Sequence, residues 1–242
     1  MDHPSQDTRT LFDRFIALRE DLSRTIVGQS ALVERLLIAL LADGHLLVEG
    51  APGLAKTTAI RALASRLQAD FARVQFTPDL LPADLTGTEV WRPQDGRFEF
   101  QPGPVFHHLL LTDEINRAPA KVQSALLEAM GERQVTVGRH TYPLPALFLV
   151  MATQNPIEQE GTFPLPEAQL DRFLMHVRIG YPDAGVETEI LRLAREQASR
   201  SLQAPAAPVE RMPLAQLFAA RARVLDLHLA PGLARYLVDL VL

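Results

Sequence analysis

A short apolar run followed by a glycine-containing turn and a lysine-led helix constrains this fold more than any other feature. Residues 46–49 read LLVE, residues 50–55 read GAPGLA, and a helical pattern begins at Lys56. An apolar run of this length, bounded by turn residues, is typical of a buried strand. A tight turn that leads into a helix gathers backbone N–H groups and the positive end of the helix dipole at one point. The segment therefore predicts an anion-binding turn between a strand and a helix.

Residues 50–57 match the phosphate-loop pattern G-x-x-x-x-G-K-[ST], with Ala55 in place of the last glycine. Lys56 would reach the β- and γ-phosphates of a nucleotide, and the Thr57 hydroxyl would coordinate Mg²⁺. We expect Ala55 to be accommodated there at a negative φ. The candidate nucleotide-binding residues of this segment are Gly50, Ala51, Pro52, Gly53, Leu54, Ala55, Lys56, Thr57 and Thr58.

Two other strand-like runs end in polar residues that suit the same site. Asp113 and Glu114 follow LLLT, and Asn155 lies in the turn that follows LFLVMA. In a parallel sheet, strand ends of this kind meet beside the phosphate loop. Asp113 suits the magnesium shell, Glu114 the polarisation of an attacking water, and the Asn155 amide can hydrogen-bond both phosphate and water. Taken alone, the acidic pair also fits an exposed strand end, and Asn155-Pro156 also fits a simple turn.

A single arginine, Arg172, follows the segment LPEAQLD. Its guanidinium, presented across a subunit boundary, would neutralise charge that develops on a transferred phosphoryl group. The alternative is a salt bridge to Asp171 or to another nearby acid, which is the more common role of a single arginine. The residues alone leave both readings open.

Strand-like and helical patterns alternate along residues 8–180, which predicts an α/β fold with a parallel sheet and helices on both faces. Further strands are expected over residues 71–76 and 176–179. Gly44 suits a left-handed cap after the helix over residues 32–41, and Gly131 is expected to close the helix that begins at Pro119. Two hairpins, near residues 90–100 and 134–142, interrupt the alternation. They are either edge decoration or devices that touch a partner.

From Pro182 onward the patterns are helical only, with a Pro/Ala-rich connector over residues 203–208. We therefore divide the chain into an α/β core with an N-terminal helix, residues 1–180, and a small helical domain, residues 181–242. The apolar pattern continues to Leu242 without a cap or polar tail. We expect the chain to cut this second domain short.

Several blocks, in order, resemble the MoxR family of AAA+ ATPases: IVGQ, GAPGLAKT, TDEINRAP, SALLEAM, ERQVTVG and ATQNPIEQEGTFPLPEAQLDRF. The resemblance implies an AAA+ P-loop core with a helical lid, and it covers residues 25–242. It implies that residues 77–105 are an insert in the second helix and that residues 132–145 are the hairpin before sensor 1. The resemblance leaves open whether Arg117 contacts the nucleotide or an adjacent subunit. The residue roles that the resemblance implies are Val27 and Gly28 near the adenine, Glu114 as catalytic glutamate, Asn155 as sensor 1, and Arg172 as an arginine finger on a neighbour's ATP.

This family resemblance implies ATP and Mg²⁺ as ligands. It also implies a ring, expected to be hexameric, that remodels or matures partner protein complexes, often beside von Willebrand A-domain proteins. The 242 residues contain no sensor 2 arginine in a G-A-S-P-R-like stretch, so we expect poor closure over the γ-phosphate. A nucleotide-gated binding scaffold with negligible hydrolysis is the second hypothesis, and a nucleic-acid motor is the third.

Composition narrows these alternatives. Lys and Arg total 24 against 29 Asp and Glu, which disfavours a general nucleic-acid-coating protein. The absence of cysteine excludes disulfides and thiolate metal sites, and it fits the cytoplasm. The longest apolar run, residues 36–42, is far short of the ~20 residues needed to cross a bilayer, so no membrane insertion is expected.

Overall fold

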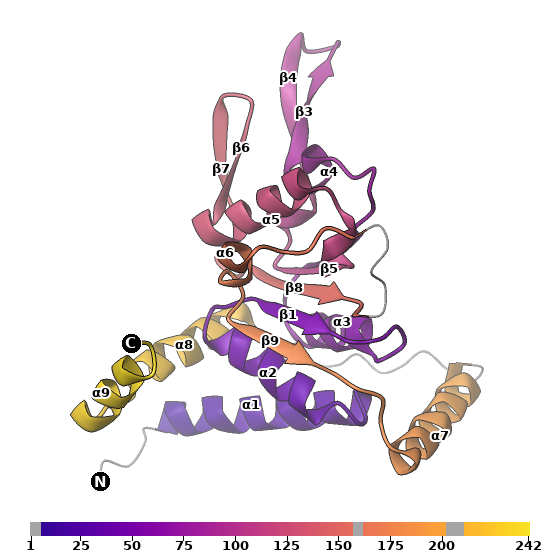
Figure 1. Cartoon of the computed structure of the whole chain (residues 1–242), viewed down its shortest axis with the longest axis vertical. Coiled ribbons are helices and arrows are strands. Elements are labelled where there is room, and N and C mark those ends of the chain that lie inside the picture. The colour runs from indigo at the N-terminus through magenta and orange to yellow at the C-terminus, as the bar shows by residue number, and fades with distance from the viewer. Residues whose placement is uncertain (1–5, 157–161, 202–210) are drawn as a thin grey trace.

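The computed structural model describes residues 6–156, 162–201 and 211–242; the connector over residues 203–208 and part of the block around residues 157–161 lie outside this range. The centre is a five-stranded sheet in the order β2-β5-β8-β1-β9, in which every neighbouring pair is parallel (Figure 1). The predicted α/β fold with a parallel sheet is therefore confirmed. Its strands are β1 (Leu46–Glu49), β2 (Phe71–Gln75), β5 (Leu109–Asp113), β8 (Leu149–Gln154) and β9 (Met175–Arg178).

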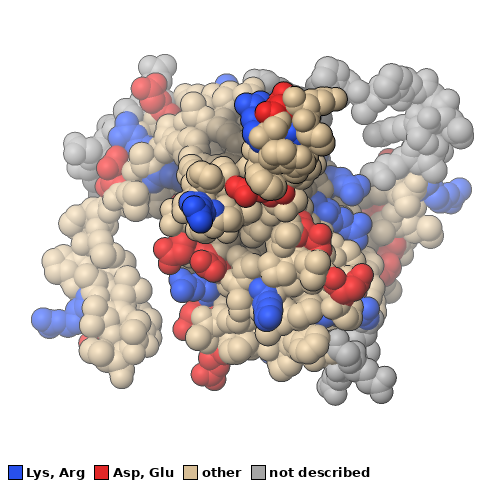
Figure 2. All heavy atoms as spheres, turned by 90° about the horizontal axis from the view of Figure 1, so that it is seen from above, with Lys and Arg blue, Asp and Glu red and all other residues tan. Residues whose placement is uncertain are grey.

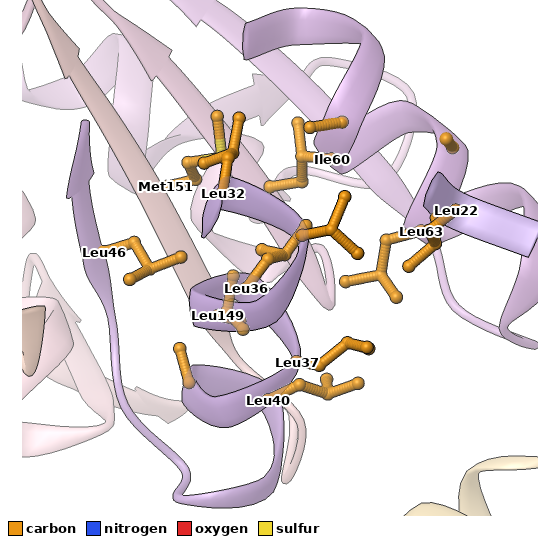
Figure 3. Packing of buried hydrophobic residues seen from close by; sticks show 14 of the residues in the cluster. Leu22, Leu32, Leu36, Leu37, Leu40, Leu46, Ile60, Leu63, Leu149 and Met151 are labelled. Carbon is orange, nitrogen blue, oxygen red and sulfur yellow. The ribbon is translucent and has the colours of Figure 1, made fainter. Parts of the chain in front are cut away.

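Helices cover both faces of this sheet because successive strand residues point to opposite sides. Leu111 and Met151 pack into one buried cluster, whereas their neighbours Leu110 and Val150 pack into a second. Figure 3 shows the first cluster, in which helix leucines such as Leu36 and Leu63 pack with Leu46 of β1 and Met151 of β8. On that face lie α1 (Gln6–Thr25), α2 (Ser30–Leu41) and α3 (Lys56–Arg66); on the other lie α4 (Pro82–Thr86) and α5 (Ala120–Glu132).

The strand register brings the carboxyl ends of three central strands to one edge of the sheet. Glu49 of β1 pairs with Gln154 of β8, and the Gly50 N–H donates to the Gln154 carbonyl at 3.2 Å. On the other side of β8, Thr112 pairs with Ala152. The turn after β1, the acidic pair at the end of β5 and the polar end of β8 are therefore neighbours in space.

Both predicted hairpins form, and each is slightly longer than its sequence pattern indicated. They project on the same side of the molecule (Figure 1). The two hairpins touch: the rings of Phe100 and Tyr142 stack with centroids 3.9 Å apart, and His140 Nδ1, next to the turn of β6–β7, lies 3.5 Å from Glu89 Oε1. The hairpins are β3 (Gly87–Arg92) with β4 (Arg97–Pro102), followed by η1 (Pro104–Phe106), and β6 (Gln134–Val137) with β7 (His140–Pro143).

The helices after β9 lie at two places on the core. Figure 1 shows α7 at one end and α8 with α9 at the other. Helix α8 packs on α1 and α2: Leu217 is fully buried, and Arg14 Nη1 donates to Gln216 Oε1 at 2.9 Å. Residues 181–242 as one separate domain thus stay a prediction, and α8 shares the core's first cluster. The remaining helices are η2 (Ile115–Arg117), α6 (Glu167–Leu170), α7 (Ala184–Ser201), α8 (Leu214–Leu225) and α9 (Pro231–Asp239).

Two glycines do not play the predicted capping role. Asp43, not Gly44, has the positive φ after α2, at +56°. Helix α5 continues past Gly131 to Glu132, and Arg133 supplies the left-handed cap at φ +55°. Among the described residues, no helix combines the length and apolar character that crossing a membrane requires.

Candidate functional site

A cavity of about 300 Å³ opens at the sheet edge where the three strand ends meet. It contains Lys56 together with the acidic pair Asp113 and Glu114 and the buried amide of Asn155. Its wall is formed by the phosphate-loop segment and by the ends of β2, β5 and β8: Pro52, Gly53, Leu54, Ala55, Lys56, Thr57, Thr58, Arg73, Gln75, Asp113, Glu114, Thr153, Gln154 and Asn155.

The turn that leads into α3 is held by close packing at its start and by left-handed backbone near its end. A β-carbon on Gly50 would lie 2.5 Å from Ile179 Cγ1, so only glycine fits there. Ala55 has φ +58°, which corrects our expectation of a negative φ. Because the pattern places glycine at this position, the backbone keeps the glycine conformation and alanine adopts it at a cost of about 1 kcal/mol.

The Lys56 ammonium folds back over the turn. It donates to the carbonyl of Gly50 and, at 3.0 Å, to that of Ala51. Gly50 and Ala51 thus contact the lysine and do not line the cavity. Burial lowers the pKa of Lys56, and the negative charges of Asp113 and Glu114 partly offset this. Those two carboxylates therefore favour the charged form of the lysine.

Asp113 is buried at the end of β5, and both of its oxygens have partners. Thr153 donates its hydroxyl to Oδ1 at 3.2 Å, and Arg73 Nε donates to Oδ2 at 2.6 Å. The same Thr153 oxygen accepts the Glu114 N–H at 3.0 Å. The Thr153 hydroxyl therefore fixes the end of β5 against the end of β8.

Glu114 has φ +58°, so the chain turns sharply and directs its side chain into the cavity. Its Oε2 accepts from Gln75 Nε2 at 2.9 Å and lies 3.0 Å from Arg117 Nε. Arg117, for which the sequence left two roles open, here pairs with the candidate catalytic carboxylate.

A second cavity, of about 270 Å³, adjoins the first and shares Gly53, Leu54, Ala55 and Thr58 with it. Val27 lines this cavity, whereas its neighbour Gly28 does not. The other lining residues are Thr25, Ile26, Gln29 and Pro182, together with Glu187, Ile190, Leu193 and Ala194 of α7. Gly28 has φ +79°, and a β-carbon there would lie 2.3 Å from Val186 Cγ1. The first cavity is lined mainly by polar and charged groups, whereas the lining of the second includes the apolar side chains of Ile26, Val27, Ile190 and Leu193. A nucleotide has this polarity, with phosphates at one end and a flat base at the other.

Arg172 lies apart from the other candidate site residues. Its side chain is exposed, lines neither cavity, and packs against Gly131 of α5. An arginine placed on the outer surface, away from its own chain's cavity, is suited to reach a neighbouring molecule.

The candidate metal ligands fit one hard cation that brings other ligands with it. Thr57 and Asp113 both line the first cavity and offer a hydroxyl and a carboxylate oxygen. Within the described ranges, no group of three or more His, Asp or Glu side chains is arranged to hold a metal by itself. Mg²⁺ is bound in this way, by one or two protein oxygens together with water and phosphate oxygens.

Sequence analysis missed the contribution of β2 and of the last residues of β8. Arg73, Gln75, Thr153 and Gln154 all line the first cavity. Arg73 and Gln75 are the exposed alternate positions of a predicted strand, which puts both on one face. That period-two pattern was the available signal, but it does not say which strand lies next to β2.

Comparisons with known proteins show which family the chain belongs to. Residues 45–175 match the model of the ATPase family associated with various cellular activities (AAA). Protein MoxR of Paracoccus denitrificans is 37% identical over 236 residues, which covers 94% of this chain and 68% of that protein. The chain belongs to the MoxR family of AAA ATPases. The predicted family and AAA+ P-loop fold are confirmed.

Two further relatives show how much of a MoxR-family protein this chain spans. Chaperone MoxR1 of Mycobacterium tuberculosis is 56% identical over 171 residues, covering 71% of this chain and 45% of that protein. A crystal structure from Cytophaga hutchinsonii superposes with a TM-score of 0.86 at 43% identity, covering 98% of this chain and 70% of that one. The chain thus spans about half the length of MoxR1.

Proposed function

We propose that this chain is the ATP-hydrolysing core of a MoxR-type chaperone. One observation carries the proposal: the cavity that holds Lys56, Asp113, Glu114 and Asn155 shares phosphate-loop residues with a second, more apolar cavity. These two adjoining cavities support a bound nucleoside triphosphate with its phosphates among charged groups and its base beside α7. The choice of ATP rests on family membership.

Each side chain then has a task that follows from its chemistry. Lys56 neutralises the β- and γ-phosphates, and Glu114 polarises the attacking water. Asn155 hydrogen-bonds the γ-phosphate and the water without adding negative charge. Thr57 and Asp113 would hold Mg²⁺, which when bound neutralises phosphate charge.

Assembly is part of the proposal. Arg172 lies outside the cavities of its own chain, which supports a ring in which it completes a neighbour's site. We propose a hexamer for this ring. The name Chaperone MoxR1 supports protein clients, and von Willebrand A-domain proteins are the proposed partners. A cytoplasmic location completes the proposal and accords with the absence of cysteine.

The hairpins offer a route from the site to a client. Helix α5 follows Glu114 along the chain, hairpin β6–β7 follows α5, and β8 then leads to Asn155. The hairpin therefore connects two segments that carry site residues. Its contact with β3–β4, through Phe100 and Tyr142, would make the two hairpins move together.

Phosphate release by the purified protein tests this function. The rate of release should rise with ATP concentration, and Lys56→Ala should abolish it. The rate per molecule of protein should also rise with protein concentration, because a neighbour completes the site. Steady release that Lys56→Ala leaves unchanged would contradict the proposal. Nucleotide binding without lysine-dependent release, even at high protein concentration, would support the binding-scaffold alternative.

The nucleic-acid alternative has little support at the hairpins. Figure 2 looks down on this side, where acidic and basic side chains are interspersed. Arg92 Nε lies 2.6 Å from Glu99 Oε2, and Arg97 Nη2 lies 3.6 Å from Asp95 Oδ2. Basic groups that are already paired with acids do not make the positive groove that a phosphate backbone requires. Tight, salt-sensitive binding of single- or double-stranded DNA would revive this alternative.

A further inference from the structure

Arg73, on β2, binds the carboxylate that the proposed function assigns to the metal. Its Nε donates to Asp113 Oδ2 at 2.6 Å, on the side of the carboxylate opposite the Thr153 contact. A divalent cation near Oδ2 would lie close to this guanidinium. Because like charges repel strongly in a partly buried site, the cation and the guanidinium compete for one oxygen.

The two donors to Asp113 differ in their freedom to move. Thr153 is buried and also accepts the Glu114 N–H, so its hydroxyl is held from two sides. The Arg73 side chain is 47% exposed, whereas that of Asp113 is 10% exposed. The carboxylate is thus the fixed partner of this ion pair, and the arginine can leave at low cost.

The position of Arg73 in the sheet keeps it near the site after it leaves. In the register of β2 with β5, Gln75 pairs with Asp113 and Arg73 pairs with Leu111. Arg73 and Gln75 therefore share a face, and both line the cavity in which the phosphates are proposed to lie. A guanidinium released from Asp113 remains beside bound phosphates and can bind their oxygens.

We propose that Arg73 is a displaceable counter-ion for the metal site. It neutralises Asp113 while the site holds no divalent cation, and it turns toward the phosphates when a cation enters with the nucleotide. This inference rests on the proposed nucleotide-binding function and adds a residue that couples metal binding to nucleotide binding.

Removal of the guanidinium makes nucleotide binding more dependent on metal, for two reasons. With metal, the nucleotide loses a guanidinium contact, but the cation no longer competes with Arg73 for Asp113, and this gain offsets the loss. Without metal, Asp113 loses the charged partner of its ion pair, and its uncompensated negative charge repels the phosphates, so the nucleotide binds more weakly. The ratio of the Kd measured in EDTA to the Kd measured in Mg²⁺ therefore increases.

Titration with mant-ADP in excess Mg²⁺ and in excess EDTA measures this ratio. For Arg73→Gln we expect the ratio to rise about fivefold, the scale of a half-exposed ion pair. Arg92→Gln is the matched control, since Arg92 also pairs with a carboxylate but lies on hairpin β3–β4; its ratio should stay at the wild-type value. An unchanged ratio in Arg73→Gln, including equal weakening in both media, would overturn the proposal.

Two measurements separate this proposal from its assumptions. Manganese binding to the protein without nucleotide, followed by electron paramagnetic resonance, should be tighter in Arg73→Gln; equal binding overturns the inference. If wild-type protein binds no mant-ADP in either medium, the proposed function fails, and the manganese result still judges Arg73.

If Arg73→Gln does not fold, the proposal can be tested on the wild-type protein. The Arg73 Nε–H signal in nuclear magnetic resonance, assigned by its loss in Arg73→Lys, should shift on addition of Mg²⁺ and ADP. It should keep its hydrogen-bonded position with ADP in EDTA. The same response in both media would overturn the proposal.

Discussion

The guanidinium of Arg172 packs against the α-carbon of Gly131, so closely that a β-carbon there would lie 2.7 Å from Nη1. Glycine is unfavourable inside a helix, by roughly 0.5–1 kcal/mol relative to alanine. Gly131 nevertheless lies within α5. The space that it leaves on the helix surface positions the proposed arginine finger.

Gly131→Ala should therefore separate activity from stability. The added methyl group pushes the guanidinium aside, and we expect phosphate release to fall roughly tenfold, a part of what loss of an arginine finger costs. The melting temperature should stay unchanged or rise, since alanine favours the helix, and the Kd for nucleotide should stay the same. Gly232→Ala in α9 is the control, because nothing lies within 4 Å of its added β-carbon. Full activity in Gly131→Ala would remove Gly131 from this role.

Glu114→Gln should retain nucleotide and lose turnover. Glutamine keeps an oxygen for the donors Gln75 and Arg117 but cannot take a proton from water. We expect phosphate release to fall at least ~100-fold, on the scale of a lost general base, with the Kd for ATP within about twofold of wild type. Glu128→Gln, an exposed residue on α5, is the matched control. Unchanged turnover in Glu114→Gln would show that Glu114 does not polarise the water.

The strands and the phosphate loop could be predicted because their signals are local. An apolar run between turn residues marks a buried strand wherever it packs. The two misread glycines depend instead on distant contacts. A β-carbon on Gly44 would lie 2.6 Å from Leu174 Cβ, and one on Gly131 would meet Arg172. Both glycines make room for a remote segment, and a local pattern cannot distinguish this from a left-handed cap.

The site residues also divide into those with a local sequence signal and those whose role depends on a distant segment. Asp113 and Glu114 were predicted because they directly follow an apolar strand. Arg73 and Gln75 were missed because their role depends on β2 lying beside β5, which sets Gln75 opposite Asp113. Strand order arises from long-range packing, so a single sequence indicates the polar face of β2 but not its neighbour.

Ala55→Gly should stabilise the protein, although glycine usually has the opposite effect. At φ +58° alanine is strained by about 1 kcal/mol, and glycine removes this strain. Part of the gain is lost, because glycine also gives the unfolded chain more conformational freedom. We expect a net gain of about 0.5 kcal/mol in the free energy of unfolding, measured in urea. Ala59→Gly, at a buried position in the regular part of α3, should lose at least about 1 kcal/mol, because it also removes a buried methyl group. Equal losses in both variants would contradict left-handed strain at Ala55.

His45 is a buried histidine at the edge of the sheet opposite the cavity. Its Nδ1 accepts the Val150 N–H at 3.0 Å, and its ring meets the edge of Phe148 with centroids 5.7 Å apart. Burial, assisted by the charge of Arg133, lowers the pKa of His45 from 6.5 to about 4. The folded protein therefore holds this imidazole neutral at pH values where the unfolded chain protonates it.

This difference predicts a loss of stability in mild acid. Since the folded pKa lies below the unfolded one, the contribution of His45 is complete above pH 6.5 and is lost as the pH falls toward 4. Between about pH 7 and about pH 5, wild type should lose about 2 kcal/mol more than His45→Gln, in which the amide oxygen still accepts the Val150 N–H without titrating. Urea unfolding at both pH values measures this, with the exposed His228→Gln as a control that keeps the wild-type loss. If His45→Gln loses as much stability as wild type, a buried neutral His45 does not cause the acid sensitivity.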